Sequence, residues 1–364
     1  MKILVSTDML PLLCVFLSMI EFSISSRITL SKFLHSSSIQ YNVASAIEAI
    51  CEASIEIQSL IRFPPSFHAP ISSSTNTNAS GEEQKPLDLV SDSIIAKALQ
   101  KCPSVAVYAS EELDEAMILR SQDGTIAVLC DPLDGSSNVD CNIPTGTIFT
   151  IVTMGADCEC VALTDLLINR KHISSSSSSS SSSSLGIGAS VLAAGYILYS
   201  SSTELVLNPS KGCGVQGFTL DPFNNEFVLT RTSIKCPLRG PYYSLNEGKS
   251  DDWPPGLSDY IADIKAGRGS WGRRYGIRYV CSLVADIHRT LLYGGWAGNP
   301  RAHLRLLFES VAMATLLKEA EGKATEGTMD ILDVVPTKLH DRLPLFAGSR
   351  DDVLEIMARG DCAQ

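Results

Sequence analysis

The sequence predicts an α/β fold with two subdomains, and three features of the chain indicate it. Residues 105–110 and 125–130 are short apolar runs rich in β-branched side chains, which is typical of buried strands. Residues 43–61 and 306–320 carry apolar side chains at helical spacing, which indicates long helices that pack against a sheet. The chain has 364 residues and 45% hydrophobic content, which is enough for one large core.

Two carboxylates follow the second predicted strand. Asp131 ends that strand, and Pro132 fixes φ, which predicts a turn that aims Asp131 and Asp134 at one spot. Gly135-Ser136-Ser137 then opens a predicted helix, whose first N–H groups can bind phosphate. Because carboxylates and phosphate repel each other, we expect a divalent cation between them. The alternative is a strand-to-helix turn in which an Asp caps the helix.

Further acids come from two other segments. Glu111-Glu112 follows the strand at residues 105–110, and ligands of open α/β sheets bind beyond the carboxyl ends of strands. Glu309 lies on the apolar face of the helix at residues 306–320, where an ionised carboxylate needs a cation. The alternatives are a solvated surface pair for Glu111-Glu112 and a partly exposed helix-start acid for Glu309.

These acids belong to motifs through which the chain resembles the fructose-1,6-bisphosphatase family over residues 30–354. The motifs are Gly81-Glu82-Glu83-Gln84-Lys85-Pro86-Leu87-Asp88, Ser110-Glu111-Glu112, the segment from Asp131 to Asn138, Leu192-Ala193-Ala194-Gly195-Tyr196, Tyr243-Ser244-Leu245-Asn246-Glu247-Gly248, Arg278 to Thr290 and Leu304 to Glu309. Details such as Pro86-Leu87-Asp88, Asp252-Trp253-Pro254 and Asn299-Pro300-Arg301 are most similar to the second, plastid-type plant isoform. The resemblance implies a layered α/β/α/β/α sugar-phosphatase fold, which inositol monophosphatase-like proteins share.

The resemblance also implies a metal site and two catalytic acids. Two to three Mg²⁺ ions, with Mn²⁺ as an alternative, would be held by Glu111, Asp131, the Leu133 carbonyl, Asp134 and Glu309. Glu82 would complete a further metal site from a mobile loop. Asp88 and Glu112 would orient or deprotonate the attacking water, with no covalent phosphoenzyme.

Substrate contacts are implied at both phosphates. Asp134 and the Gly135, Ser136 and Ser137 amides would hold the 1-phosphate, and the other end would meet Asn246, Lys249, Arg278, Tyr279, Asn299, His303 and Arg305. Arg278 would reach across from a neighbouring subunit, which implies a homo-oligomer, by resemblance a tetramer. The family usually has Tyr where this chain has Lys249 and Asn299, and a Lys near His303. The loop from Asn299 to His303 is also shorter, so we expect a more permissive pocket, with Lys249, Arg301 and His303 restoring positive charge.

The predicted activity is hydrolysis of the 1-phosphate of D-fructose 1,6-bisphosphate to fructose 6-phosphate and phosphate. The family performs this step in gluconeogenesis, the Calvin cycle and sucrose synthesis. Two alternatives stay open: a related phosphatase acting on sedoheptulose bisphosphate or an inositol phosphate, and a catalytically weak or silent paralogue that binds sugar phosphates. The retained carboxylates favour an enzyme, whereas the changed positions Lys249, Asn299 and His303 favour the paralogue.

Composition excludes some partners. A net charge of −11 argues against binding to nucleic acid or to an anionic membrane by the mature form. Eleven cysteines at irregular spacing, without paired CxxC motifs, indicate a reducing compartment. Cys158 and Cys160 lie where the light-regulated plastid isoform carries a redox loop, but they lack an obvious partner, so thiol regulation is not the favoured interpretation.

The chain divides into a few segments. Residues 1–27 are predicted to be a targeting or disordered segment, residues 28–212 the metal- and phosphate-binding subdomain, and residues 213–358 the subdomain that completes the site. The serine run at residues 174–184 is predicted to be a disordered insertion. Residues 71–80 should form a loop, and residues 217–220 and 226–230 a hairpin.

The resemblance to the plastid-type isoform implies the chloroplast stroma, with the cytosol as the alternative. Residues 10–20 are apolar but too short for an ordinary transmembrane helix. Residues 23–38 partly match the serine-rich, acid-poor composition of a plastid transit peptide. A signal-like start set upstream of the true one is a further interpretation.

We expect weak or no inhibition by AMP. Family members that AMP inhibits use an N-terminal Thr-Gly-Glu segment and a Lys-Tyr pair before the metal-binding strand. Residues 30–38 lack the first, and Thr125-Ile126 replaces the second, so the AMP phosphate loses charged contacts. An AMP titration of phosphate release tests this, and a micromolar inhibition constant would contradict it.

Overall fold

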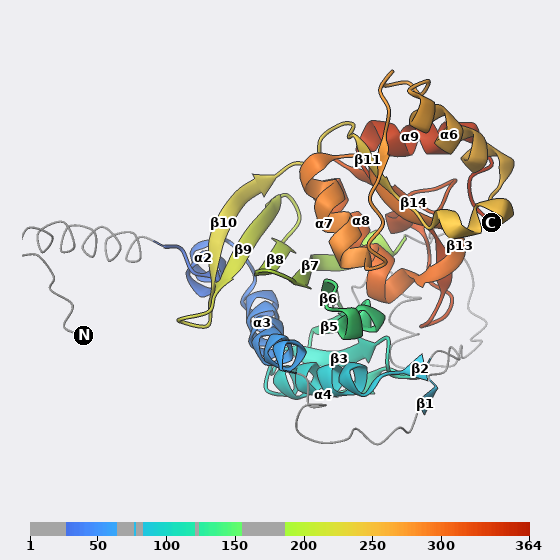
Figure 1. Ribbon diagram of the computed structural model, residues 1–364. Coiled ribbons are helices and arrows are strands. Elements are labelled where there is room, and N and C mark those ends of the chain that lie inside the picture. The colour runs from blue at the N-terminus through green and yellow to red at the C-terminus, as the bar shows by residue number, and fades with distance from the viewer. Residues whose placement is uncertain (1–26, 64–75, 78–82, 121–123, 155–185) are drawn as a thin grey trace, which may run out of the picture.

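The computed structural model describes residues 27–63, 76–77, 83–120, 124–154 and 186–364 (Figure 1). The targeting segment up to residue 26, Glu82, the pair Cys158 and Cys160, and the serine run at residues 174–184 lie outside these residues. Among the described helices, none is long and apolar enough to cross a membrane.

Two large sheets form the frame of the molecule. The first has eight strands in the order β10-β9-β8-β7-β6-β5-β3-β4, in which only the β3–β5 pair is parallel. Its strands are β3 (Val105–Ser110), β4 (Met117–Ile118), β5 (Ile126–Asp134), β6 (Thr145–Thr153), β7 (Val191–Tyr199), β8 (Thr203–Asn208), β9 (Val215–Asp221) and β10 (Glu226–Ile234).

The second sheet has five strands in the order β12-β11-β13-β15-β14. They are β11 (Tyr242–Ser244), β12 (Gly276–Ile277), β13 (Trp296–Arg305), β14 (Lys323–Thr325) and β15 (Arg342–Gly348). A separate two-stranded ladder joins β1 (Asn76–Thr77) to β2 (Glu83–Gln84). The predicted loop at residues 71–80 therefore contains a short strand, and the rest of it lies outside the described residues.

Helices fill the three layers around these sheets, as Figure 1 shows. The helices α2 (Leu30–Ser36), α3 (Tyr41–Arg62) and α4 (Pro86–Gln100) pack on one face of the eight-stranded sheet. The middle layer holds α7 (Leu283–Tyr293) and α8 (Val311–Glu319), whose apolar residues contact both sheets. The outer face of the five-stranded sheet is covered by α6 (Pro255–Ala266) and α9 (Arg350–Arg359). The predicted α/β/α/β/α layering is confirmed.

Several predicted elements are confirmed with changed bounds. The helix predicted at residues 43–61 is α3, and the predicted hairpin is the β9–β10 pair. The helix predicted at residues 306–320 begins with the π-helical turn η6 (Leu306–Ser310), which continues into α8. His288 in α7 forms a hydrogen bond between its Nδ1 and the Tyr196 hydroxyl at 2.9 Å.

The prediction that Asp131 ends its strand is wrong, because β5 continues through Pro132 to Asp134. The ladder with β6 shifts register between Asp131 and Asp134, so this stretch is a bulge. Proline fits there because the Leu133 N–H bonds to Asp131 Oδ1 at 3.0 Å, and the Pro132 carbonyl accepts from Thr147 Oγ1 at 2.8 Å.

The transit-peptide composition of residues 23–38 is also corrected. Residues 30–36 form α2, whose Leu30 and Leu34 are buried in the core cluster shared with α3. Since these residues belong to the packed fold, their serines do not mark a removable segment.

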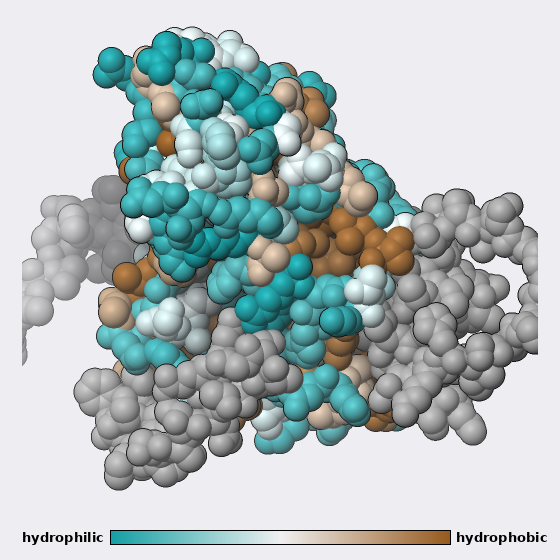
Figure 2. All heavy atoms as spheres, turned by 90° about the vertical axis from the view of Figure 1, so that its right-hand side faces the viewer, coloured by the Kyte–Doolittle hydropathy of each residue, from teal (hydrophilic) through white to brown (hydrophobic). Residues whose placement is uncertain are grey.

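The face that carries β13 and the C-terminal residues is mostly hydrophilic (Figure 2). It is the right-hand side of Figure 1, turned toward the viewer. Arg301, Asp252 and Gln364 belong to this region and are half-buried or exposed. Their contacts are described below.

We expect Gly195→Ala in β7 to destabilise the fold by about 1–3 kcal/mol, as overpacked cores do. A Cβ at this position would lie 2.6 Å from Phe149 Cζ and 2.9 Å from the Val206 carbonyl oxygen. Gly276→Ala is the control, because its nearest neighbour would lie at an ordinary 3.5 Å. Thermal unfolding measures both variants, and equal melting temperatures would contradict the predicted packing.

Candidate active site

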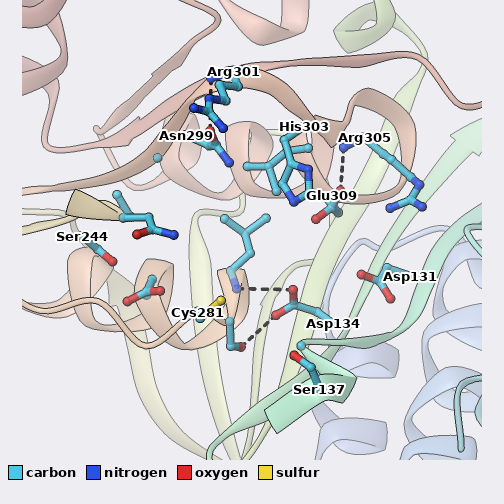
Figure 3. Close-up of a pocket in the computed structure, with 18 of the residues that line it drawn as sticks. Asp131, Asp134, Ser137, Ser244, Cys281, Asn299, Arg301, His303, Arg305 and Glu309 are labelled. Carbon is cyan, nitrogen blue, oxygen red and sulfur yellow. Dashed lines mark hydrogen bonds between the residues drawn. The ribbon is translucent and has the colours of Figure 1, made fainter. Parts of the chain in front are cut away.

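One pocket of about 640 Å³ lies between the two sheets, and it gathers most of the predicted site residues. Its lining includes Asp88, Glu111, Glu112, Asp131, Leu133, Asp134, Gly135, Ser136, Ser137, Asn246, Lys249, Tyr279, Asn299, His303, Arg305 and Glu309. Arg278 is not among the lining residues, and Glu82 lies outside the described residues. Figure 3 shows the pocket from within.

Three buried carboxylates meet at one end of the pocket. Asp131 and Asp134 come from the β5 bulge and Glu309 from η6, and one oxygen of each lies within 4.8 Å of the others. Burial raises the pKa of Asp131 well above its ordinary value, and the nearby charges of Glu111 and Asp134 raise it further. Burial also raises the pKa of Glu309 well above its ordinary value, with Glu111 as the next cause. A divalent cation would relieve this repulsion, so the donor set fits a hard metal ion.

The start of α7 holds Asp134 in place. Its carboxylate accepts hydrogen bonds from Ser282 Oγ at 2.8 Å, the Val284 N–H at 2.9 Å and the Leu283 N–H at 3.3 Å. Burial raises the pKa of Asp134, and these donors lower it in part. The positive end of the helix therefore fixes the direction of one carboxylate.

A turn at the end of β13 holds Glu309. The π-helical geometry of η6 places its carboxylate over the Arg305 N–H, which donates to Oε2 at 2.5 Å. The Arg305 side chain is buried and forms an ion pair with Glu111. In this structure Arg305 therefore contacts a carboxylate of the acidic end, and its contact with substrate stays a prediction.

Asp88 lies beside the phosphate-binding turn. Pro86 starts α4, and Asp88 at the third helical position accepts from the Lys85 N–H at 2.9 Å, which closes the first turn. The same oxygen, Oδ2, accepts from Ser136 Oγ at 3.2 Å. Oδ1 is buried without a hydrogen-bond partner among the described residues, so it can accept a hydrogen bond from a water in the pocket.

The turn at residues 135–137 begins the short 3₁₀ helix η3 (Ser136–Cys141). Gly135 has a φ of +71°, and a Cβ there would lie 3.1 Å from Ser282 Cβ. The first N–H groups of a helical turn have no partner within the turn, so those of Ser136 and Ser137 are suited to phosphate oxygens. The predicted helix is confirmed as a 3₁₀ turn.

The opposite end of the pocket carries bases and amides. Asn246 caps η5 (Glu247–Asp252), and Lys249 lies within that turn. Asn299, Arg301 and His303 come from an irregular stretch of β13, which is a bulge rather than the predicted loop. Arg301 and Asn299 lie across the cavity from Asp134 and Ser137 in Figure 3.

Arg278 lies outside the pocket of its own chain. Its Nη1 donates to the Ile277 carbonyl at 2.7 Å, and its guanidinium lies 4.9 Å from the centre of the Tyr242 ring. This exposed position agrees with a side chain that serves a neighbouring subunit, and that role stays a prediction.

The lining residues to which the sequence analysis gave no role include the polar Ser244, Ser282 and Asp286. Asp286 accepts from the Val280 N–H at 3.1 Å, and burial raises the pKa of its carboxyl to about 6. Ser282 precedes an apolar helix, and a serine at this position predicts an N-cap. The hydrogen bond from its hydroxyl to Asp134 could not be predicted from local sequence, because Asp134 is 148 residues away.

Comparisons with known proteins identify the same family in both halves of the chain. The family models "Fructose-1-6-bisphosphatase, N-terminal domain" and "Fructose-1-6-bisphosphatase, C-terminal domain" match residues 26–232 and 236–359. The chain is 43% identical over 291 residues to the cytosolic fructose-1,6-bisphosphatase of Brassica napus, covering 78% of this chain and 79% of that one. It is 39% identical over 325 residues to the chloroplastic enzyme of Pisum sativum, covering 86% and 77%.

Solved structures give the same result. The fold superposes on the holo fructose-1,6-bisphosphatase of Leishmania major with a TM-score of 0.79 and 34% identity, covering 92% of this chain and 99% of that one.

We expect Asp131→Asn to stabilise the metal-free protein. The substitution removes one of several buried carboxylates that repel each other, and each unit by which such an environment raises a pKa corresponds to about 1.4 kcal/mol. The same variant should lose the rise in melting temperature that Mg²⁺ gives the unchanged protein. Thermal unfolding with EDTA and with Mg²⁺ measures both effects.

The pH profile is the control for that experiment. Unfolded Asp and Glu titrate near 3.8 and 4.5, and Asp131 and Glu309 titrate higher when folded. The metal-free native state therefore binds more protons, so its stability should fall as pH rises above about 4.5 toward the folded pKa values. A metal-free protein that gains stability over this range, or an Asp131→Asn variant that is less stable in EDTA, would contradict the account.

Proposed function

The chain belongs to the fructose-1,6-bisphosphatase family, and we propose that its acidic pocket hydrolyses the 1-phosphate of D-fructose 1,6-bisphosphate. The products are fructose 6-phosphate and inorganic phosphate. The observation that supports this most strongly is the meeting of Asp131, Asp134 and Glu309 beside the turn at residues 135–137. A cation-binding cluster next to phosphate-binding amides suits a metal-assisted phosphatase.

Binding of the 1-phosphate is assigned to the turn. The Ser136 and Ser137 amides would donate to its oxygens, and Gly135 leaves room for this approach. Glu111, Asp131, Asp134, Glu309 and the Leu133 carbonyl would hold two to three Mg²⁺ ions, with Mn²⁺ as an alternative and with Glu82 contributing to a further site. When bound, Mg²⁺ neutralises the charge of the phosphoryl oxygens and of the leaving oxygen.

The attacking water is assigned to Asp88 and Glu112. Both residues line the pocket, and Asp88 Oδ1 offers a buried acceptor beside Ser136. One of these two carboxylates would accept the proton of the water while the water oxygen attacks phosphorus in line. The bond between phosphorus and the C1 oxygen breaks, that oxygen takes up a proton from solvent water, and the carboxyl group returns its proton to solvent.

The sugar and its second phosphate are assigned to the opposite end. Arg278 would enter this part of the pocket from a neighbouring subunit. The other residues assigned to the sugar and its second phosphate line the pocket of their own chain: Asn246, Lys249, Tyr279, Asn299 and His303. We therefore propose a homo-oligomer, with a tetramer as the specific state. Residues 28–212 supply most of the metal and phosphate ligands, and residues 213–358 supply Glu309 and the sugar pocket.

Both plastid and cytosol suit this activity, because the relatives include enzymes of both compartments. We propose the chloroplast stroma, from the motifs similar to the plastid-type isoform. Attachment of residues 1–29 to a fluorescent protein tests this: import into isolated chloroplasts supports it, and retention outside them favours the cytosol.

We expect phosphate release to require Mg²⁺ or Mn²⁺ and to stop in EDTA. Asp134→Asn should reduce kcat by several orders of magnitude, because it weakens the metal site that would orient the attacking water and the leaving oxygen. The assay uses fructose 1,6-bisphosphate, sedoheptulose 1,7-bisphosphate and an inositol phosphate in parallel. Substantial hydrolysis in EDTA would refute the mechanism, and binding without turnover would favour the silent paralogue.

We expect Arg278→Ala to raise KM for fructose 1,6-bisphosphate much more than for fructose 1-phosphate. A charged guanidinium–phosphate contact is worth about 1.5–3 kcal/mol, and it exists only when the second phosphate is present. Sedimentation of the variant checks that the oligomer persists. Equal KM changes for both substrates would place Arg278 away from that phosphate.

A further inference from the structure

The two ends of the pocket have opposite charge. The carboxylates Asp131, Asp134 and Glu309 gather at one end, and Arg301 lies across the cavity from Asp134 in Figure 3. Lys249 also lines the pocket. The guanidinium of Arg305 is already paired with Glu111, and Arg278 lies outside the pocket of its own chain. Arg301 is therefore the guanidinium that the chain's own pocket offers at its basic end.

A bulge in β13 places Arg301 on the rim. In the ladder between β13 and β15, Asn299 pairs with Leu345, and Leu304 pairs with Leu343. Between these two pairs β13 advances by five residues and β15 by only two. The extra residues leave the ladder, and the Arg301 N–H bonds to Asn299 Oδ1 at 3.1 Å, which fixes the turn. Pro300 is buried at its base.

Two side chains orient the Arg301 guanidinium. Nη2 forms an ion pair with Asp252 at the end of η5, and Nε donates to Gln364 Oε1 at 3.3 Å. Gln364 also donates its backbone N–H to the Pro300 carbonyl at 2.7 Å and its side-chain amide to the Asp252 carbonyl. We call Asp252, Pro300, Arg301 and Gln364 the rim cluster.

The rim cluster leaves Arg301 able to bind an anion. A guanidinium has five N–H donors, and these two contacts use two of them. The Asp252 side chain is 63% exposed and that of Arg301 33% exposed, and ion pairs in such settings are weak. A phosphate dianion, which accepts bidentate hydrogen bonds, can therefore compete with this carboxylate.

We propose that Arg301 binds the second phosphate of the sugar bisphosphate within its own subunit, and that Asp252 weakens this contact by its charge. The inference rests on the proposed function and names a specificity-determining residue of the same site. Arg301 would thereby add a bidentate guanidinium to the positive charge that Lys249 already brings to the pocket.

Kinetics with two substrates tests the role of Arg301. Arg301→Ala should raise KM for fructose 1,6-bisphosphate about tenfold to hundredfold, with kcat and KM for fructose 1-phosphate changed less than about twofold. Asp252→Asn keeps a hydrogen-bond acceptor and removes the charge, so it should lower KM for the bisphosphate by about two- to fivefold at low salt. Arg273→Ala is the control, because this arginine packs on Trp271 away from the pocket lining.

Two results would overturn the proposal. Equal KM changes for both substrates in Arg301→Ala would show that Arg301 does not contact the second phosphate. A similar rise in KM in Arg301→Ala and Asp252→Asn would show that the ion pair only holds the bulge. Melting temperatures of all variants identify a general loss of folding.

Calorimetry separates this inference from the proposed function. Fructose 6-phosphate and fructose are titrated into the Mg²⁺-loaded protein, which needs no turnover. Arg301→Ala should weaken binding of fructose 6-phosphate by about tenfold or more relative to the unchanged protein, and an unchanged affinity would overturn the proposal. Absent turnover of the bisphosphate would refute the proposed activity while this comparison still decides the role of Arg301.

Discussion

The repulsion among buried carboxylates is the constraint on which the rest of this structure depends. Asp131 and Asp134 reach the site from the eight-stranded sheet, and Glu309 reaches it from the turn that follows β13. Such a cluster is stable only where other groups hold it, and here the start of α7 and the Arg305 N–H do so. The middle layer of helices therefore has two roles: it joins the sheets, and it orients the buried carboxylates that are proposed to bind metal.

The same helix connects the two ends of the pocket. At its first turn α7 donates to Asp134, and from the same turn Asp286 accepts the Val280 N–H beside Tyr279. Farther along, Arg289 Nη1 donates to the Arg278 carbonyl at 3.2 Å. A change in the direction of α7 would therefore move the proposed metal ligand Asp134 and the segment proposed to bind the sugar together. One helix, α7, therefore positions residues proposed for hydrolysis and residues proposed for sugar recognition.

Local patterns predicted the parts of the site that are continuous in sequence. The acids after β3 and in β5, the glycine turn and the apolar face of Glu309 all have local signals, and the structure brings them together. The bulge that carries Pro132 was predicted to be a turn. The hydrogen bond from Thr147 Oγ1 to the Pro132 carbonyl, which helps the strand to continue, comes from the neighbouring strand β6 and has no local signal. Ser282 and the partners of Arg301 were missed for the same reason: Asp134, Asp252 and Gln364 are distant in sequence, and only the tertiary fold brings them near.

The central claim is that carboxylates from β5 and from η6 form one cation site. Isothermal titration of Mg²⁺ into the unchanged protein, Asp131→Asn, Glu309→Gln and the double variant tests it most directly. The account predicts that either single substitution weakens binding by at least tenfold, and that the double variant loses much less than the sum of the two free-energy changes, since both residues serve one site. Normal Mg²⁺ affinity in Glu309→Gln, or strictly additive losses, would contradict it.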